Sequence, residues 1–418
     1  MMSQAFYTGI NGIKAHQYGI DVISDNLSNI STNGFRGYTT EFSSLFEEAL
    51  VTASSFSNAG SGVGIGTKLN AVAMNESQGV FKLSDRSTDL AIMGDGWFGI
   101  QAEGKPLYTR DGAFTFDKNR DLVTNDGYYV LGTMGNNIND GVLTQQLAEV
   151  ELGAVNTQQK LQFPEDLIFP VQPTTEASFY GNLTALDETR VISAGIIDAQ
   201  NNRNNLRLEF TKSVPQVSPG SQWDITATVE NLEGTEVYTT NSGRVTFDAA
   251  GALLTNTLTS INNNGTNVAI NLGSGYDGVI AMGDKFSSSS SANGLEAGDL
   301  LGYDINKNAE VVATFSNGMQ SAVGMIAVYH FQNDRGLERI NGARFAESQN
   351  SGRPIFFQDE NGKSIIGTDI TNFKLEGSNV RMEVGLTEII VMQRSYDANS
   401  KSITTADEML QKALSMDA

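Results

Sequence analysis

The sequence predicts a mainly β, multi-domain protein with an α-helix at each end, in which antiparallel β domains are carried on a paired, coiled-coil-like domain of the N- and C-terminal helices. Three observations predict this fold class. Near both termini apolar residues recur at intervals of three and four, the period of a helix seam. Between the termini apolar and polar residues alternate with a period of two, as in half-buried strands. Glycine is abundant, with 43 residues among 418, which indicates many turns between short strands.

The N-terminal helix is predicted over residues 1–30, with Asn33-Gly34 as a stop signal because glycine readily adopts positive φ. Gly9, Gly12 and Gly19 each cost about 1 kcal/mol of helix propensity, so this helix needs a partner. Its apolar seam consists of Phe6, Ile10, Ile13, Ile20 and Leu27.

The C-terminal helix is predicted over residues 384–418, and more than three heptads match. An ordinary core helix would show a similar pattern. The position of both seams at the chain ends favours pairing with each other or with the helices of neighbouring subunits. The residues of this seam are Ile389, Met392, Tyr396, Asn399, Ile403, Ala406, Leu410 and Ala413.

The central segment is predicted to form two β domains. Residues 71–150 with 305–375 form an inner domain, residues 151–304 an inserted outer domain, and residues 31–70 with 376–383 connect the inner domain to the helices. The insertion begins near a proline cluster and ends near a run of five serines, which are typical of linkers. Within the insertion, apolar residues alternate with polar ones in two stretches, at Trp223, Ile225, Ala227 and Val229 and at Leu206, Leu208 and Phe210.

Composition excludes several classes of function. The chain has no Cys, which rules out disulfides, thiolate catalysis and Cys-based zinc sites, and only two His. Its net charge of −21 disfavours binding to nucleic acid or to anionic membranes. No apolar run approaches the ~18 residues that span a bilayer, so membrane insertion is not expected. The N-terminus also lacks a secretory signal pattern, and by that test alone the chain would be cytoplasmic.

The apparent chemical motifs fail on context. Gly94, Gly96 and Gly99 match G-x-G-x-x-G, but Gly104 and Pro106 follow where a dinucleotide site needs a helix, so a turn is favoured. Asp117, Asn119 and Asp121 have the alternate spacing of a calcium loop without its glycine, so a β-turn is favoured.

The remaining candidates for catalysis are isolated. His16 and His330 have no evident Ser or Asp partner, and sequence cannot show the carboxylate separation that a glycosidase would need between Asp85 and Asp89. We therefore predict no catalytic, cofactor-binding or metal-binding residues and no enzymatic activity.

Several blocks of the sequence, in the same order, resemble the rod and hook family of bacterial flagellar axial proteins, and most closely the hook subunits. The N-terminal block at residues 19–37 carries the signature of that family in Asn26, Asn29, Asn33, Gly34 and Phe35. The C-terminal block at 375–414 carries Gln393 and Arg394 at motif positions. Further matching blocks lie at 87–100, 108–132, 313–331 and 336–352.

Two positions depart from the family pattern. Arg120 stands where relatives usually have Gly, so its turn is either differently shaped or strained. Arg381 stands where an acidic residue is usual, which puts contacts at the base of the C-terminal helix in doubt.

The resemblance implies a subunit that self-assembles into a tube with the terminal helices inside and the β domains outside. Its main partner is itself in a helical homopolymer. The resemblance implies four further partners: the distal rod protein, the hook cap, the hook–filament junction protein and the flagellar export apparatus. It also implies an extracellular location in the flagellar hook or basal body, reached by export without a cleaved signal peptide. Residues 54–66, rich in Gly, Ser and Asn, would let helices and outer domains shift in a flexible universal joint.

Two other functions stay open at this point. A distal rod subunit shares the terminal motifs but normally lacks a large insertion. A secreted acidic adhesin, or a carbohydrate-active enzyme, would fit the acidity and glycine content but does not explain the terminal heptads.

Overall fold

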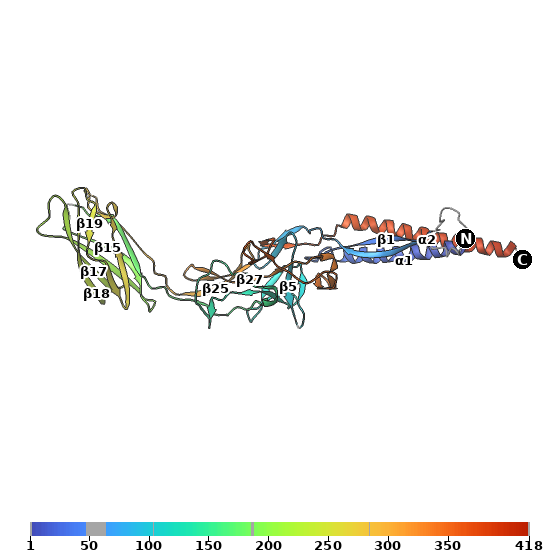
Figure 1. The fold of residues 1–418 in the computed structure, drawn as a ribbon, viewed down its shortest axis with the longest axis horizontal. Helices are drawn as coiled ribbons and strands as arrows, with labels where there is room; N and C mark the ends of the chain where they lie inside the picture. Colours follow the sequence, from blue (N-terminus) through green and yellow to red (C-terminus); the bar gives the residue numbers. More distant parts are fainter. Residues whose placement is uncertain (1, 47–63, 103, 185–187, 284, 417–418) are drawn as a thin grey trace.

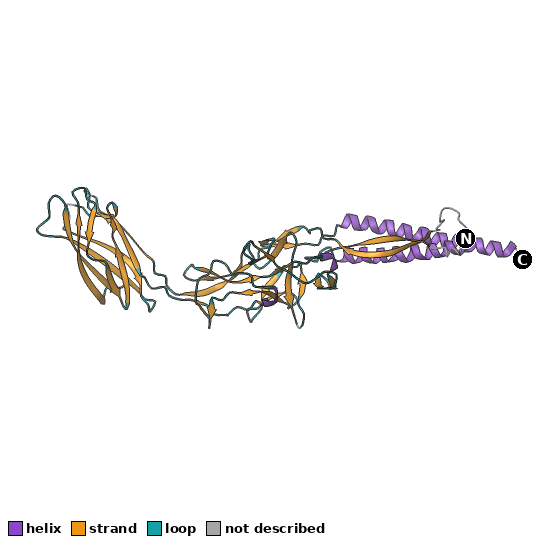
Figure 2. Ribbon diagram, viewed as in Figure 1, coloured by secondary structure: helices purple, strands orange, loops and turns teal. Residues whose placement is uncertain are grey.

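The protein is elongated, with a pair of helices at one end, a β domain in the middle and a second β domain at the other end (Figure 1). Both α-helices lie in the first of these parts, and strands dominate the other two (Figure 2). The predicted fold class is therefore confirmed. The computed structural model describes residues 2–46, 64–102, 104–184, 188–283 and 285–416.

The two helices, α1 (Met2–Ser28) and α2 (Met382–Met416), lie side by side and run antiparallel. α2 begins two residues before the position expected from its heptads. A long antiparallel hairpin of β1 (Tyr38–Phe46) and β2 (Gly64–Met74) lies along α1. Among the described residues, neither helix holds an apolar stretch long enough to cross a membrane.

The chain leaves α1 through a short series of turns. Asn29 caps the helix, because its Nδ2 donates to the Asp25 carbonyl at 2.9 Å while its Oδ1 accepts from the Thr32 hydroxyl at 3.2 Å. Gly34 then has φ of 65°, and a Cβ there would lie 2.4 Å from the backbone nitrogen of Asp111. The expected positive φ at Gly34 is confirmed, and the close approach makes glycine necessary at this position.

The inner β domain is built on one sheet of 15 strands, with β9, β5 and β27 near its centre. Its core is apolar, and Phe98, Phe114 and Val323 are fully buried in it. The strands of this sheet are β5 (Trp97–Gln101), β6 (Leu107–Thr109), β7 (Phe114–Phe116), β8 (Leu122–Thr124), β9 (Tyr129–Met134), β10 (Ile138–Asn139), β11 (Val142–Leu143), β12 (Gln159–Lys160), β13 (Ile168–Phe169), β25 (Gly298–Ile305), β26 (Glu310–Phe315), β27 (Gln320–Ile326), β28 (Val328–Tyr329), β29 (Glu338–Asn341) and β30 (Arg344–Ala346).

Smaller sheets and two 3₁₀ turns complete the inner domain. Three antiparallel pairs lie beside the large sheet, and one of them leads directly into the connection to α2. The pairs are β3 (Phe81–Leu83) with β34 (Lys374–Glu376), β4 (Leu90–Met93) with β33 (Asp369–Asn372), and β31 (Phe357–Gln358) with β32 (Ser364–Ile365), and the turns are η1 (Val155–Thr157) and η2 (Asp334–Gly336).

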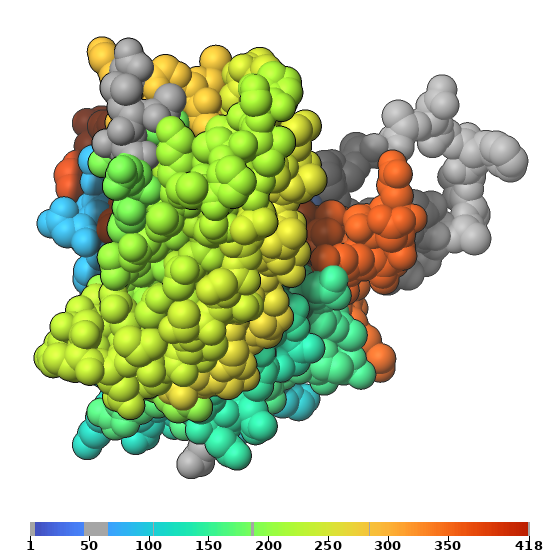
Figure 3. All heavy atoms as spheres, turned by 90° about the vertical axis from the view of Figure 1, so that its left-hand side faces the viewer, coloured from blue at the N-terminus to red at the C-terminus, as the bar shows by residue number. Residues whose placement is uncertain are grey.

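The outer β domain is a sandwich of a five-stranded and a six-stranded sheet, and it forms the front of the molecule in an end-on view (Figure 3). The alternation expected for Trp223 to Val229 is confirmed, because the apolar residues are buried and the polar ones between them are not. The strands are β14 (Glu176–Asn182), β15 (Thr189–Ile197), β16 (Arg203–Lys212), β17 (Ser221–Asn231), β18 (Val237–Phe247), β19 (Leu253–Asn256), β20 (Ser260–Asn263), β21 (Thr266–Asn271), β22 (Gly273–Ser274), β23 (Asp277–Ile280) and β24 (Ser287–Ala292).

Two features of the outer segment differ from the expectation. The five-serine run is no linker, because it lies in β24, every residue of which pairs with β14. Some pairings are parallel, namely those of β14 with β21 and β23 and that of β11 with β13. Serine composition indicated a linker, but exposed edge strands tolerate such residues when a neighbour supplies the hydrogen bonds.

The change from one domain to the other occurs at a narrow neck. The backbones of Gln172 and Leu295 exchange two hydrogen bonds there, of 2.9 and 2.8 Å. Strands β12, β13 and β25 belong to the inner sheet, so the limits at 151 and 304 do not coincide with the change of sheet. The division into four domains stays a prediction, and the pairing supports an insertion between Gln172 and Leu295.

One turn recurs in both β domains and explains the apparent calcium loop. The carboxylate Oδ1 of Asp117 accepts backbone hydrogen bonds from Asn119 at 2.8 Å and Asp121 at 2.9 Å, and the fourth residue, Arg120, has φ of 60°. The same arrangement occurs at Asp198, Asn306, Asp359 and Asp248. The turn interpretation is confirmed, since the oxygen of Asp117 serves the backbone.

We expect Arg120→Gly to stabilise the protein by up to about 1 kcal/mol, because a left-handed conformation is costly for a residue with a Cβ. Asn201 occupies the equivalent position in another copy of the turn with φ of 67°, and asparagine tolerates this region. Asn201→Gly is thus the matched control, with a smaller gain. Urea unfolding of both variants measures the difference, and a clear loss of stability in Arg120→Gly would contradict the strain at this turn.

Candidate assembly surface

The two helices meet along the small residues of α1. Gly9, Gly12 and Gly19 are buried, and the helix backbone at each faces α2. A Cβ at Gly9 would lie 2.6 Å from Cγ1 of Ile403, and one at Gly12 would lie 2.5 Å from Oδ1 of Asn399. The glycines that weaken α1 in isolation therefore provide its contact face, and they let α2 approach the backbone.

We expect Gly9→Ala to loosen the helix pair, because the branched side chain of Ile403 has to move away. Gly19→Ala is the control, since the nearest atom to its Cβ would be the flexible Met392 sulfur at 3.2 Å. The control should gain up to about 1 kcal/mol of helix propensity. Thermal melting followed by far-UV circular dichroism compares the two, and equal melting curves would contradict the close approach.

Most of the predicted C-terminal seam faces α1 of the same chain. Met392, Asn399 and Ile403 contact its glycine face, and His16 Nδ1 lies 3.4 Å from the Met392 sulfur. Tyr396 and Ala413 are exposed. The partly or fully buried members of this seam are Ile389, Met392, Asn399, Ile403, Ala406 and Leu410.

The predicted N-terminal seam lies on a different face of α1. Its centre is roughly 90° around the helix from the glycine face at 3.6 residues per turn. Ile10 is 40 % exposed, and Leu27, at the edge nearest the glycine face, contacts Gly385. The other members, Phe6, Ile13 and Ile20, are half-buried. Assembly through these seams stays a prediction, and the N-terminal seam is only partly covered within a single chain.

Further apolar side chains are uncovered on the helix pair. α2 extends past the N-terminal end of α1 (Figure 1), and Leu414 and Met416 on this extension are 71 % and 83 % exposed. Buried apolar area is the main source of association energy, so these side chains favour a partner. The others exposed by 38 % or more are Tyr7, Ile10, Tyr18, Met382, Val384, Leu386, Ile390, Val391, Tyr396 and Met409.

Two asparagines join the ends of the helices to the hairpin. The side chain of Asn26 accepts from the Tyr38 backbone N–H at 2.8 Å and donates to its carbonyl at 2.7 Å. Asn379 accepts from the Gly37 N–H at 2.7 Å and donates to the carbonyls of Asn75 and Ser77, both at 2.8 Å. The motif residue Asn26 thus has a structural role at the junction of helices and β domain.

Aromatic and charged groups strengthen the same junction. Phe35 is 1 % exposed, and the Arg339 guanidinium lies 5.0 Å from its ring centre and 2.6 Å from Asp25 of α1. Asn33, next to the conformationally restricted Gly34, is half-buried. The N-terminal motif residues therefore gather where α1 meets the inner β domain.

A buried charge cluster lies at the centre of the junction. Glu376 pairs with Arg36 at 3.0 Å and with Arg110 at 2.9 Å, and all three side chains are at most 6 % exposed. Arg110 also donates to the carbonyls of Gly96 at 2.6 Å and Gly94 at 2.8 Å. Burial, with the nearby Arg110 charge, lowers the pKa of Arg36 to about 10. We call Arg36, Arg110 and Glu376 the junction cluster.

The sequence patterns did not predict four residues of the junction, Arg110, Glu376, Arg339 and Asn379. They lie in different segments of the chain, and no spacing pattern joins them. The motif residues Gln393 and Arg394 are exposed on α2 away from the junction, and the structure gives them no role within one chain.

Arg381, the second departure from the family pattern, lies exposed directly before α2 and lines a small pocket with Asn26 and Tyr38. The start of α2 is held by Asn379 rather than by a residue at this position.

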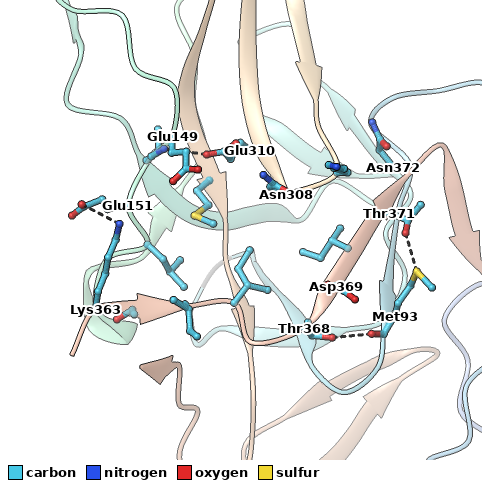
Figure 4. A pocket seen from close by; sticks show the side chains of 18 residues that line it. Met93, Glu149, Glu151, Asn308, Glu310, Lys363, Thr368, Asp369, Thr371 and Asn372 are labelled. Atoms are coloured by element: carbon cyan, nitrogen blue, oxygen red, sulfur yellow. Dashed lines mark hydrogen bonds and ion pairs between the residues drawn. The ribbon is translucent and has the colours of Figure 1, made fainter. Parts of the chain in front are cut away.

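A groove of the inner domain is lined by side chains that already make structural contacts (Figure 4). Lys363 pairs with Glu151 at 3.1 Å, and the buried Glu310 accepts from the Val150 N–H at 3.2 Å and from Asn306 Nδ2 at 2.7 Å. Within the described ranges, no group of three or more His, Asp and Glu residues is placed to hold a metal ion.

The motifs that failed on context are turns and packing positions. Gly94 and Gly96 have φ of 121° and 128° between β4 and β5, although these strands do not pair with each other. His330 is 4 % exposed, its Nε2 lies 2.6 Å from the Ile366 carbonyl, and burial lowers its pKa. Asp89 accepts from the Ser84 hydroxyl and pairs with Arg86.

Family models match both ends of the chain and the start of the inner domain. Residues 6–36 match "Flagella basal body rod protein", residues 91–167 match "Flagellar hook protein FlgE/F/G D1 domain", and residues 373–416 match "Flagellar basal body rod FlgEFG protein C-terminal". The flagellar hook protein FlgE of Brucella suis is 30 % identical over 426 residues, which cover 96 % of each chain. The chain belongs to the flagellar hook protein family.

Other relatives agree with this membership. FlgE of Borreliella burgdorferi is 28 % identical over 98 % of this chain and 99 % of its own, and FlgE of Escherichia coli is 27 % identical over 97 % and 98 %. The crystal structure of Helicobacter pylori flagellar hook protein FlgE2 aligns with a TM-score of 0.51 and 17 % identity over 71 % of this chain and 100 % of that chain, which shows a shared fold. A structural role in the flagellar hook follows, and a rod subunit, an adhesin or an enzyme is not favoured.

Proposed function

We propose that this chain is the subunit of a tubular flagellar hook and that it polymerises through the helix pair. The observation that carries the proposal is the helix pair itself, which leaves Ile10 of the N-terminal seam and the end of α2 exposed within one chain. Those side chains are apolar and lie on two helices, so repeated copies have surface to bury against one another. The β domains then project outward, and the outer one tunes the shape of the tube.

The finer parts of the proposal concern partners and location. As a hook subunit the chain would leave the cell through the flagellar export apparatus without a cleaved signal. It would meet the distal rod protein at one end of the tube, and the hook cap and then the hook–filament junction protein at the other. Membership of the hook family supports a place in the hook and basal body.

The proposed universal joint requires parts that shift relative to one another. Sequence analysis assigned this slack to residues 54–66, of which 54–63 lie outside the described residues. The neck between Gln172 and Leu295 offers a second place, because it is two chain segments wide and is bridged by the exposed Arg203–Glu296 ion pair.

Electron microscopy of the purified full chain under polymerising conditions tests the proposal. Curved tubes are expected of a hook subunit, and straight rods would favour a rod subunit instead. A calcium titration of thermal stability is the matching test of the adhesin alternative, which predicts a large rise in melting temperature.

Deleting the outer domain at the neck should leave polymerisation intact and give straighter or stiffer tubes. The deletion joins Gln172 to Leu295 through a short Gly-Ser linker. A short linker is sufficient because the backbones of these two residues are already hydrogen-bonded to each other. The matched control joins residue 150 to residue 305, which also removes β13 and most of β25 from the inner sheet and should misfold. A neck deletion that folds but forms no tubes, seen by electron microscopy, would make the outer domain an obligatory contact.

A further inference from the structure

A shallow groove runs along α2 beside the N-terminal end of α1. Its floor is made of small side chains, Ala5 of α1 with Ala398, Ser402 and Thr405 of α2, and Lys401 and Met409 form its walls. The groove continues directly from the contact between α1 and α2. Small side chains between longer ones make a hole that takes a bulky residue of another helix.

Two exposed tyrosines lie on one face of α1. Tyr7 is 64 % exposed and Tyr18 is 56 % exposed. They are eleven residues apart, which is about three helical turns, so they lie on the same face about 16 Å apart. That face is roughly 150° around α1 from the glycine face, so neither tyrosine reaches the α2 groove of its own chain.

We propose that α1 of a second copy packs its Tyr7–Tyr18 face on α2, with the ring of Tyr7 in this groove. This proposal rests on the proposed function. The spacing supports the pairing. Ser402 in the groove and Val391, which is 55 % exposed, are also eleven residues apart on α2. With the second α1 antiparallel to α2, as within one chain, Tyr7 meets Ser402 when Tyr18 meets Val391.

The chemistry of the groove suits tyrosine better than an aliphatic residue. The ring packs on the methyl group of Ala398, and its hydroxyl reaches the hydroxyls of Ser402 and Thr405 at the polar side of the floor. The Lys401 ammonium at the wall lies within reach of the ring face.

The pairing joins two different faces of the subunit. In a helical array each copy offers α1 to one neighbour and α2 to another, so the contact is heterologous and repeats as long as its rotation does not close a ring. If two copies made the same contact reciprocally, assembly would stop at a dimer.

Cysteine crosslinking in assembled tubes tests the contact, because the chain contains no Cys. Tyr7→Cys with Ser402→Cys should give a ladder of covalent oligomers on oxidation, seen by non-reducing gel electrophoresis. Tyr7→Cys with Thr404→Cys is the matched control. Thr404 is exposed at the same height but about 140° from the groove around α2, and this pair should stay monomeric. Tubes without a ladder, or equal ladders in both pairs, overturn the proposal.

A second variant keeps the test independent of the crosslink. Ser402→Trp fills the groove and should raise the critical concentration for polymerisation at least tenfold, whereas Thr404→Trp should leave it unchanged. Polymerisation of Ser402→Trp at the wild-type concentration overturns the tyrosine contact and leaves the hook function standing. A wild-type chain that forms no tubes would remove the hook function itself, so the two failures are distinguishable.

Discussion

Replacing Ile403 with Asp is expected to abolish tube formation while the β domains keep their melting temperature. Ile403 contacts the backbone of α1 at Gly9, in the middle of the helix pair. A carboxylate there replaces an apolar contact with the backbone of α1 and costs several kcal/mol if it stays ionised. The helix pair touches the inner β domain only near the other end of the helices, so its loss should spare the β domains.

The matched control is Thr404→Asp, which introduces the same charge at an exposed neighbouring position. Electron microscopy scores tubes, and circular dichroism scores helix and β melting separately. Because Ile403 packs within its own chain, the helical signal of the monomer should also fall in Ile403→Asp. Normal tubes from Ile403→Asp, or a large drop in β-domain stability, would contradict the assignment of Ile403 to the helix pair.

The sequence predicted the helices and the strongly alternating strands because their patterns are local. The heptads of α2 and the alternation from Trp223 to Val229 each lie within one segment of the chain. Each pattern arises because one face of the helix or strand is buried. The glycines of α1 were interpreted only as a cost in helix propensity. Their role depends on the close approach of α2, which begins more than 350 residues further along the chain.

The junction was beyond sequence analysis for the same physical reason. Arg110 lies 266 residues before Glu376, and neither residue stands in a pattern that marks a buried charge. Motif resemblance located Asn26, Gly34 and Phe35 but could not say what they contact. The serine run shows the opposite error, since its composition indicated a linker and the hydrogen bonds of β14 make it a strand.

Removing the charge of Glu376 should have the largest effect on stability. Glu376→Ala leaves Arg36 and Arg110 buried without their shared carboxylate, and breaking a buried pair in this way costs about 3–5 kcal/mol. Urea unfolding followed by tryptophan fluorescence measures the loss, because Trp97 lies in the inner domain and Trp223 in the outer domain. Asp224→Ala is the control, because it breaks an exposed pair with Arg244 in the outer domain and should cost less than about 1 kcal/mol.

Substitutions of the two arginines of the junction cluster should destabilise the protein by different amounts. Arg110→Met removes the donor to Glu376 and also the donors to the carbonyls of Gly94 and Gly96, and the bond to Gly96 lies among buried residues. Arg36→Met removes its pair with Glu376 and a single carbonyl contact, to Ser77. Each buried acceptor left without a donor costs about 1–3 kcal/mol. Arg110→Met should therefore lower the free energy of unfolding more than Arg36→Met does, by at least the cost of one such acceptor. Equal losses in the same urea assay would mean that the cluster acts through its net charge alone, and that Arg110 does not hold the turn between β4 and β5.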